Sequence, residues 1–212
     1  PPSILHGLQA VAPLKRGRCN VRETAPVTPV PDAYVDAVIR IVPSQIAVMI
    51  ELQRLTGMRP GEVVLMRTCD IDTTGQIWQY RPMEHKTQHH GRTRVVYLGP
   101  QAQAILRHHL KPNLEAFLFS PQDVKRERAR RARVARVTPM TPSQLMRRPK
   151  PDPKRSPGTR YTTMTYARAI AYACDRALPH PVLSEIPFDQ LTPTQRHELE
   201  AWRKQHRWSP NR

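Results

Sequence analysis

Apolar positions recur at helical spacing along much of the chain and predict a mainly helical protein. Val35, Val38 and Ile39 fall on one face of a short helix, and Pro43 separates that helix from the next. The following segment, 46–55, is apolar almost all round, which is typical of a buried helix.

Helical patterns return in the second half of the chain, at about 100–110, from about 121, at 162–178 and after Thr192-Pro193. A hydroxyl residue followed by proline is a typical helix start, so the last helix begins there with Leu199 and Trp202 on its inner face. The helix at 162–178 is predicted to bury one apolar stripe: Ala167, Ile170, Ala171, Cys174 and Leu178.

Two segments, about 76–82 and 92–98, carry β-branched and aromatic residues around a turn rich in His and Gly, and predict a β-hairpin. The predicted fold class is therefore mainly α with a small antiparallel β-sheet (α+β). Residues 1–30 are basic and rich in Pro without sustained periodicity, and are interpreted as a linker to the domain at 31–212. A basic insertion is expected within that domain at about 121–160.

The chain is strongly basic, with a net charge of +17 over 212 residues. Such a surface favours a polyanionic partner and salt-sensitive association, with RNA and DNA about equally compatible. The three cysteines, Cys19, Cys69 and Cys174, are widely spaced, which fits reduced thiols better than a zinc ribbon or a disulfide framework. No apolar run approaches membrane-spanning length, so no membrane partner is expected.

The most informative segment is Thr56-Gly57-Met58-Arg59-Pro60-Gly61-Glu62. Gly57 can end one helix in a left-handed conformation, and Pro60 suits the first turn of the next. Arg59 is thereby placed at a rigid corner between two buried helices. A guanidinium held in this way can bind a phosphate through two parallel hydrogen bonds.

The segment "LTGMRPGEVVLMRTCDID" resembles the first active-site box of the tyrosine recombinases, the phage-integrase type of DNA strand-exchange enzyme. The resemblance continues through the predicted hairpin. Its turn holds His85-Lys86-Thr87, and its return strand, Val95-Val96-Tyr97-Leu98, is similar to the family's "R-x-V-P-L" strand. The box, its spacing and the hairpin together carry the resemblance, which implies the catalytic-domain fold of that family.

The resemblance implies a role for each matching residue. Arg59 would hold the scissile phosphate, and Lys86 would protonate the leaving 5′-oxygen as the general acid. Glu62 would support the site rather than transfer protons. Structural alternatives remain open, because Arg59 could instead pair with Glu62 or cap carbonyl groups, and Lys86 could be an exposed turn lysine.

The family's second box, with a further arginine and histidine, and its nucleophilic tyrosine have no counterpart up to Arg212. The resemblance therefore implies a catalytic domain truncated before that box, inactive alone, with its nucleophile beyond Arg212. Asn211 stands where the box would open. Asn can donate a hydrogen bond to phosphate but cannot transfer a proton near neutral pH, and it could simply cap a helix. Tyr161, Tyr166 and Tyr172 precede this point, so the family order argues against them as nucleophiles, and packing or DNA-facing roles are expected for the first two.

Two groups of residues are expected to contact DNA. One lies on the hairpin turn and the other on the basic helix after 121, where seven cations accompany one carboxylate. The residues are His85, His89, Arg92, Lys125, Arg126, Arg128, Arg130, Arg131 and Arg133. The hairpin histidines have no further ligands at metal-binding spacing, so neither a metal nor another cofactor is expected.

The predicted function is site-specific recombination of double-stranded DNA through a 3′-phosphotyrosine, as in the integration or excision of a mobile element. A homo-oligomer assembled on DNA is expected for the full-length enzyme, in a bacterial cytoplasm at the nucleoid. The main alternative is a non-catalytic nucleic-acid-binding remnant of the same fold. A third is a type IB topoisomerase relative, which shares the chemistry.

Overall fold

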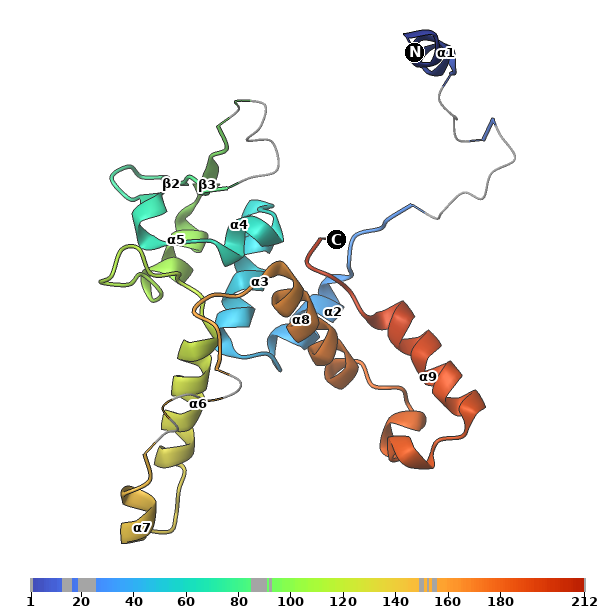
Figure 1. Cartoon of the computed structure of the whole chain (residues 1–212). Helices are drawn as coiled ribbons and strands as arrows, with labels where there is room; N and C mark the ends of the chain where they lie inside the picture. Colours follow the sequence, from blue (N-terminus) through green and yellow to red (C-terminus); the bar gives the residue numbers. More distant parts are fainter. Residues whose placement is uncertain are drawn as a thin grey trace.

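The computed structural model describes residues 2–12, 17–18, 26–84, 91, 93–148, 151, 153 and 156–211. Helix α3 (Ser44–Thr56) lies at its centre, in contact with α2 (Asp32–Ile39), α4 (Pro60–Val64) and α5 (Pro100–Arg107) (Figure 1). Its inner side chains, among them Ile46, Met49 and Leu52, are almost fully buried. The all-round apolar segment therefore forms the predicted buried helix.

An antiparallel sheet covers one side of this helical core. Strands β1 (Ile71–Asp72), β2 (Trp78–Tyr80) and β3 (Val96–Leu98) lie in the order β1-β2-β3, with Trp78 opposite Leu98. Alternate side chains of β2 and β3 enter the core, whereas Tyr97 faces outward. The pairing of the two predicted hairpin strands is confirmed, although both strands are shorter than predicted. Strand β1 extends the sheet by pairing with β2.

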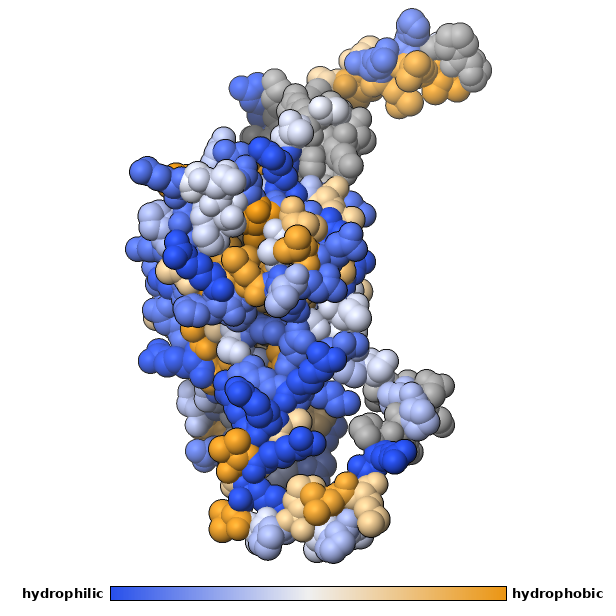
Figure 2. Space-filling model, turned by 90° about the vertical axis from the view of Figure 1, so that its left-hand side faces the viewer, coloured by the Kyte–Doolittle hydropathy of each residue, from blue (hydrophilic) through white to orange (hydrophobic). Residues whose placement is uncertain are grey.

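Helix α6 (Pro121–Val134) projects from the body of the molecule and carries α7 (Pro142–Leu145) near its far end (Figure 1). We call residues 121–145 the basic arm. No residue of α6 is fully buried. Figure 2 shows hydrophilic residues over most of the arm, with exposed apolar side chains toward its end, including Val137 and Met146.

Helix α8 (Thr163–Ala177) packs against α2 and α4, and α9 (Pro193–His206) packs against α8. The stripe predicted for α8 is partly wrong. The buried positions are Tyr166, Ile170, Ala173 and Cys174, whereas Ala167, Ala171 and Leu178 are only half-buried. Tyr166 and Ala173 belong to the inner face because α8 lies between two helices, α2 and α4, which widens the buried side.

The start and the inner face of α9 agree with the sequence. The Thr192 hydroxyl accepts a hydrogen bond from the backbone N–H of Gln195 at 3.3 Å, as a helix cap does. Leu199 is buried in a small second cluster with Leu183 and Leu191, and the Trp202 indole donates to the Leu178 carbonyl. Short 3-10 turns lie at Thr68–Asp70, Leu183–Glu185 and Phe188–Gln190.

The predicted fold class is confirmed, since the chain is mainly helical with a small antiparallel sheet. Helix α7 (Pro142–Leu145) was not expected within the basic insertion, and α1 (Pro2–Ala10) was not expected within the predicted linker. The apolar residues Ile4 and Leu8 of α1 are one helical turn apart, a run too short to appear as sustained periodicity. Within the described residues, no helix is both long and apolar enough to cross a membrane.

Candidate functional site

The corner between α3 and α4 has the predicted backbone. Gly57 has φ 64°, in the left-handed region that favours glycine, and its N–H donates to the Gln53 carbonyl at 2.8 Å. Arg59 is extended and precedes α4, in which Pro60 occupies the first turn. Both helices are anchored in the core, so the position of the Arg59 backbone is fixed.

The side chain of Arg59 is 52% exposed, whereas that of Glu62 is 3% exposed. Glu62 accepts the Arg59 backbone N–H through Oε2 at 2.8 Å. The Arg59 guanidinium lies farther away, with Nη1 at 3.8 Å from Oε1. Glu62 therefore supports the helix corner, as expected, and leaves most of the Arg59 guanidinium open to a ligand.

A second arginine reaches the same carboxylate. Arg94 Nε lies 3.1 Å from Glu62 Oε1, and Arg94 Nη2 lies 3.4 Å from Oε2. The Tyr80 hydroxyl donates to the backbone carbonyl of Glu62 at 2.6 Å, so β2 and the segment before β3 are both joined to α4. Sequence reasoning missed Arg94. No signal in the sequence set Arg94 apart from the other basic residues of the predicted hairpin.

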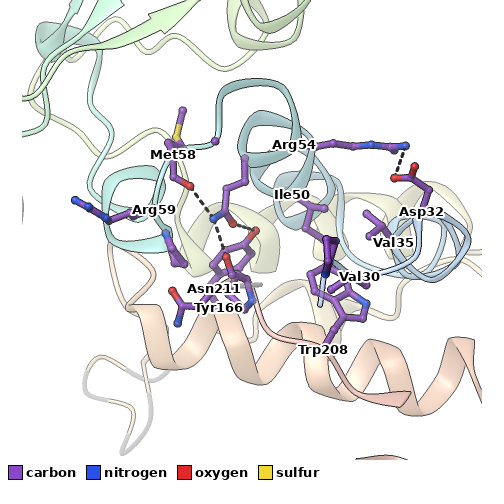
Figure 3. A pocket seen from close by; sticks show the side chains of 15 residues that line it. Val30, Asp32, Val35, Ile50, Arg54, Met58, Arg59, Tyr166, Trp208 and Asn211 are labelled. Carbon is purple, nitrogen blue, oxygen red and sulfur yellow. Dashed lines mark hydrogen bonds and ion pairs between the residues drawn. The ribbon is translucent and has the colours of Figure 1, made fainter. Parts of the chain in front are cut away.

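Asn211 lies beside Arg59, although 152 positions separate them in the sequence. Both residues line a pocket of about 600 Å³ whose apolar walls include Ile50 and Trp208. Both also line a neighbouring hollow of about 470 Å³. In Figure 3, Arg59 and Asn211 lie at one end of the larger pocket, and the Arg54–Asp32 ion pair lies at the other.

Four predicted site residues, His85, Lys86, His89 and Arg92, lie outside the described residues. The chain next to them is informative, because Glu84 lines the smaller hollow together with Arg59 and Asn211. The hairpin segment that leads to Lys86 therefore starts at the hollow beside Arg59.

The predicted DNA-contacting cations of the basic helix lie on α6 and divide into two sets. Arg126 pairs with Asp123 at 3.4 Å, and Arg131 pairs with Glu127. For the other four, the described part of the chain provides no ion pair; they are Lys125, Arg128, Arg130 and Arg133. The helix thus carries a local excess of positive charge along its projecting length.

None of the six tyrosines has a free hydroxyl at the Arg59 hollows. Tyr166 lines the larger pocket, but it is buried, its hydroxyl donates to Gln53 Oε1 at 2.8 Å, and burial raises its pKa. Burial also raises the pKa of Tyr161 to about 12. Tyr172 is exposed and lines neither hollow. The packing roles expected for Tyr161 and Tyr166 are confirmed.

Metal chemistry has no support in the part of the chain that the structure describes, where no three His, Cys, Asp or Glu side chains form a metal-binding group. Comparison of the chain with protein-family models, curated proteins and solved structures gives no match.

Proposed function

We propose that this chain belongs to a DNA strand-exchange enzyme of the tyrosine recombinase type. The observation that carries the proposal is the Arg59 corner, where a fixed, largely unpaired guanidinium shares two hollows with Asn211. Both side chains can donate hydrogen bonds to phosphate oxygens. Phosphodiester transfer places extra negative charge on these oxygens, and a fixed cation stabilises that charge.

In the proposed reaction, a tyrosine hydroxyl gives its proton to solvent and its oxygen attacks the phosphorus atom. The bond between phosphorus and the 5′-oxygen breaks, and that oxygen takes a proton from Lys86. The product is a 3′-phosphotyrosine and a free 5′-hydroxyl, and rejoining reverses these steps. Arg59 and Asn211 would bind the non-bridging oxygens throughout. The proposed reaction also requires a second arginine and a nucleophilic tyrosine, and none of the described tyrosines has a free hydroxyl at the hollows.

The basic arm would contact the DNA backbone away from the reacting phosphate. Four cations without ion pairs on one projecting helix suit sequence-independent contact with phosphates. The partner in this proposal is double-stranded DNA, bound as a homo-oligomer by the full-length enzyme.

The engaged tyrosines also support a second candidate, a non-catalytic DNA-binding module that keeps the fold. The two candidates differ in the sequence encoded after codon 212. A Leu-Arg-His motif followed by a tyrosine supports the enzyme, whereas a stop codon supports the module.

Phosphate binding at the corner can be tested on the chain itself with Arg59→Ala and a matched control, Arg54→Ala. Arg54 lines the same pocket but pairs with both Asp32 and Asp36 at 2.9 Å. We expect Arg59→Ala to weaken binding of short duplex DNA about tenfold, the equivalent of one charged contact. Arg54→Ala should lower stability while changing affinity little. Equal losses of affinity would contradict a phosphate site at Arg59.

A further inference from the structure

One half-buried side-chain amide, that of Gln53, connects the two sides of the candidate site. Gln53 Nε2 donates to the carbonyl oxygen of Met58 at 3.0 Å and to that of Pro210 at 3.1 Å. These two residues immediately precede Arg59 and Asn211. A single NH₂ group therefore sets the distance between the backbone segments that carry the two candidate phosphate-binding residues (Figure 3).

The orientation of this amide is itself fixed. Gln53 Oε1 accepts the hydroxyl of Tyr166 at 2.8 Å, and Tyr166 is fully buried in α8. The tyrosine donates its only proton to Oε1, so Nε2 must face the two carbonyl groups. A carboxylate at position 53 could accept from Tyr166 but could not donate to either carbonyl.

The segment after α9 depends on this contact. Arg207 is held to Asp175 by two hydrogen bonds of 2.7 and 2.6 Å, and Trp208 is buried against the larger pocket. Beyond Trp208, residues 209–211 make one hydrogen bond to the rest of the described chain, the one from Gln53. Loss of this bond leaves the position of Asn211 without a polar restraint.

We propose that Gln53 is a positioning residue, held by Tyr166, that places Asn211 against Arg59. The effect of Gln53 on phosphate binding rests on the proposed function. The effect of Gln53 on the placement of Asn211 can be measured without DNA. Gln53 touches no phosphate itself. It acts by restraining the backbone on both sides of the hollow.

The test separates positioning from stability by using two variants. Gln53→Met removes the restraint but also leaves the buried Tyr166 hydroxyl without an acceptor, which is destabilising. The double variant Gln53→Met/Tyr166→Phe removes both polar partners, so stability should recover toward that of the wild type. Positioning should remain lost, because neither carbonyl regains a donor.

Gln103→Met is the matched control. Gln103 Nε2 also donates to two backbone carbonyls, those of Gln76 at 2.7 Å and Leu98 at 2.9 Å, at a distance from both hollows. Its loss should destabilise the fold without changing the placement of Asn211.

The structural readout is hydrogen exchange of the Trp208 indole, whose Nε1 is buried without a hydrogen-bond partner. We expect faster indole exchange in both Gln53 variants and wild-type exchange in Gln103→Met, each measured by NMR under stabilising conditions. Wild-type protection of the Trp208 indole in the double variant would overturn the proposal.

The functional readout is affinity for a short fluorescein-labelled duplex DNA. The double variant should bind about tenfold more weakly, and this loss should disappear in an Arg59→Ala background, because the two effects act through one site. A loss that persists unchanged in that background would also overturn the proposal. If Arg59→Ala alone leaves affinity unchanged, the proposed function fails, while indole exchange still decides the positioning role.

Discussion

Arg94 and Glu62, 32 residues apart, form a closer ion pair than Arg59 and Glu62: Arg94 Nε lies 3.1 Å from Glu62 Oε1, and Arg59 Nη1 lies 3.8 Å from it. Through this contact, Arg94 is the main cationic partner of the Glu62 carboxylate. Glu62 is occupied by Arg94 and by the Arg59 backbone N–H, so it neutralises the Arg59 guanidinium only weakly. At the corner itself two cations share one carboxylate, and Glu84 adds a second carboxylate to the lining of the smaller hollow.

Replacement of Arg94 should therefore destabilise the protein. Arg94→Met leaves a carboxylate that is 3% exposed with one fewer partner, which should cost about 1–3 kcal/mol of unfolding free energy. Urea denaturation provides the measurement. The control is Arg81→Met, because the Arg81 side chain is exposed and its guanidinium donates, within the described chain, to the Gln79 amide oxygen and to no carboxylate. A similar loss of unfolding free energy in both variants would contradict a stabilising role for the Arg94–Glu62 contact.

The helix corner was predictable because its signals are local. Gly57, which ends one helix, lies three positions before Pro60, which begins the next. Each of these two residue types has its own backbone preference. The hairpin was predictable for the same reason, although its strands proved shorter. Strand ends depend on pairing with neighbouring strands, which residue type alone does not determine.

The contacts that complete the site were not predictable, because they join distant parts of the chain. Gln53 and Pro210 are 157 positions apart, and an amide inside a helix has no sequence signature that names its partner. Arg94 was likewise indistinguishable from other basic residues of the hairpin. Only the packing of α4 against β2 and α8 brings these groups together.

The basic arm should account for much of the salt dependence of DNA binding. Neutralising Lys125, Arg128, Arg130 and Arg133 to Gln should reduce the slope of log affinity against log salt by up to about 3–4, or ~0.9 for each lost phosphate contact. Fluorescence anisotropy over a salt series measures the slope. Arg126→Gln/Arg131→Gln is the control, since both residues already pair with carboxylates. An unchanged slope in the four-residue variant would mean that α6 does not face DNA.

The 212-residue chain should form no covalent adduct with DNA. The Tyr166 hydroxyl is buried and engaged with Gln53, and the Tyr80 hydroxyl is engaged with the Glu62 carbonyl. Incubation with a nicked suicide substrate, followed by denaturing electrophoresis, tests this expectation. An adduct that survives denaturation would contradict it, and peptide mapping would then identify the tyrosine, with exposed Tyr97 and Tyr172 considered first.

The stability of the protein should depend on pH through His109. Its ring packs 5.7 Å from that of Phe119, and burial lowers its pKa below the ordinary histidine value. The unfolded chain then binds this proton more readily than the folded one, so stability falls as pH drops below about 6.5. His109→Phe should flatten this part of the curve. Urea unfolding at pH 8 serves as the reference, because the His109 ring is unprotonated there and position 109 is neutral in both proteins. If the loss of stability at acid pH is the same in the variant, His109 is not its source.

The last prediction concerns Lys86, which the family resemblance makes the general acid. An acid is needed only while the leaving group is a poor one, such as a 5′-alkoxide. In a version of the protein that carries a nucleophile, Lys86→Ala should be slow on ordinary DNA and should recover on a 5′-thio-linked substrate, whose thiolate leaves without a proton. Arg59→Ala is the contrasting variant. It should lose about 3 kcal/mol of transition-state stabilisation on both substrates, because phosphate charge develops whichever group departs. Single-turnover cleavage rates distinguish the two patterns. If the thio substrate restores nothing to Lys86→Ala, another group protonates the leaving oxygen, and the segment that follows Glu84 serves only to bind DNA.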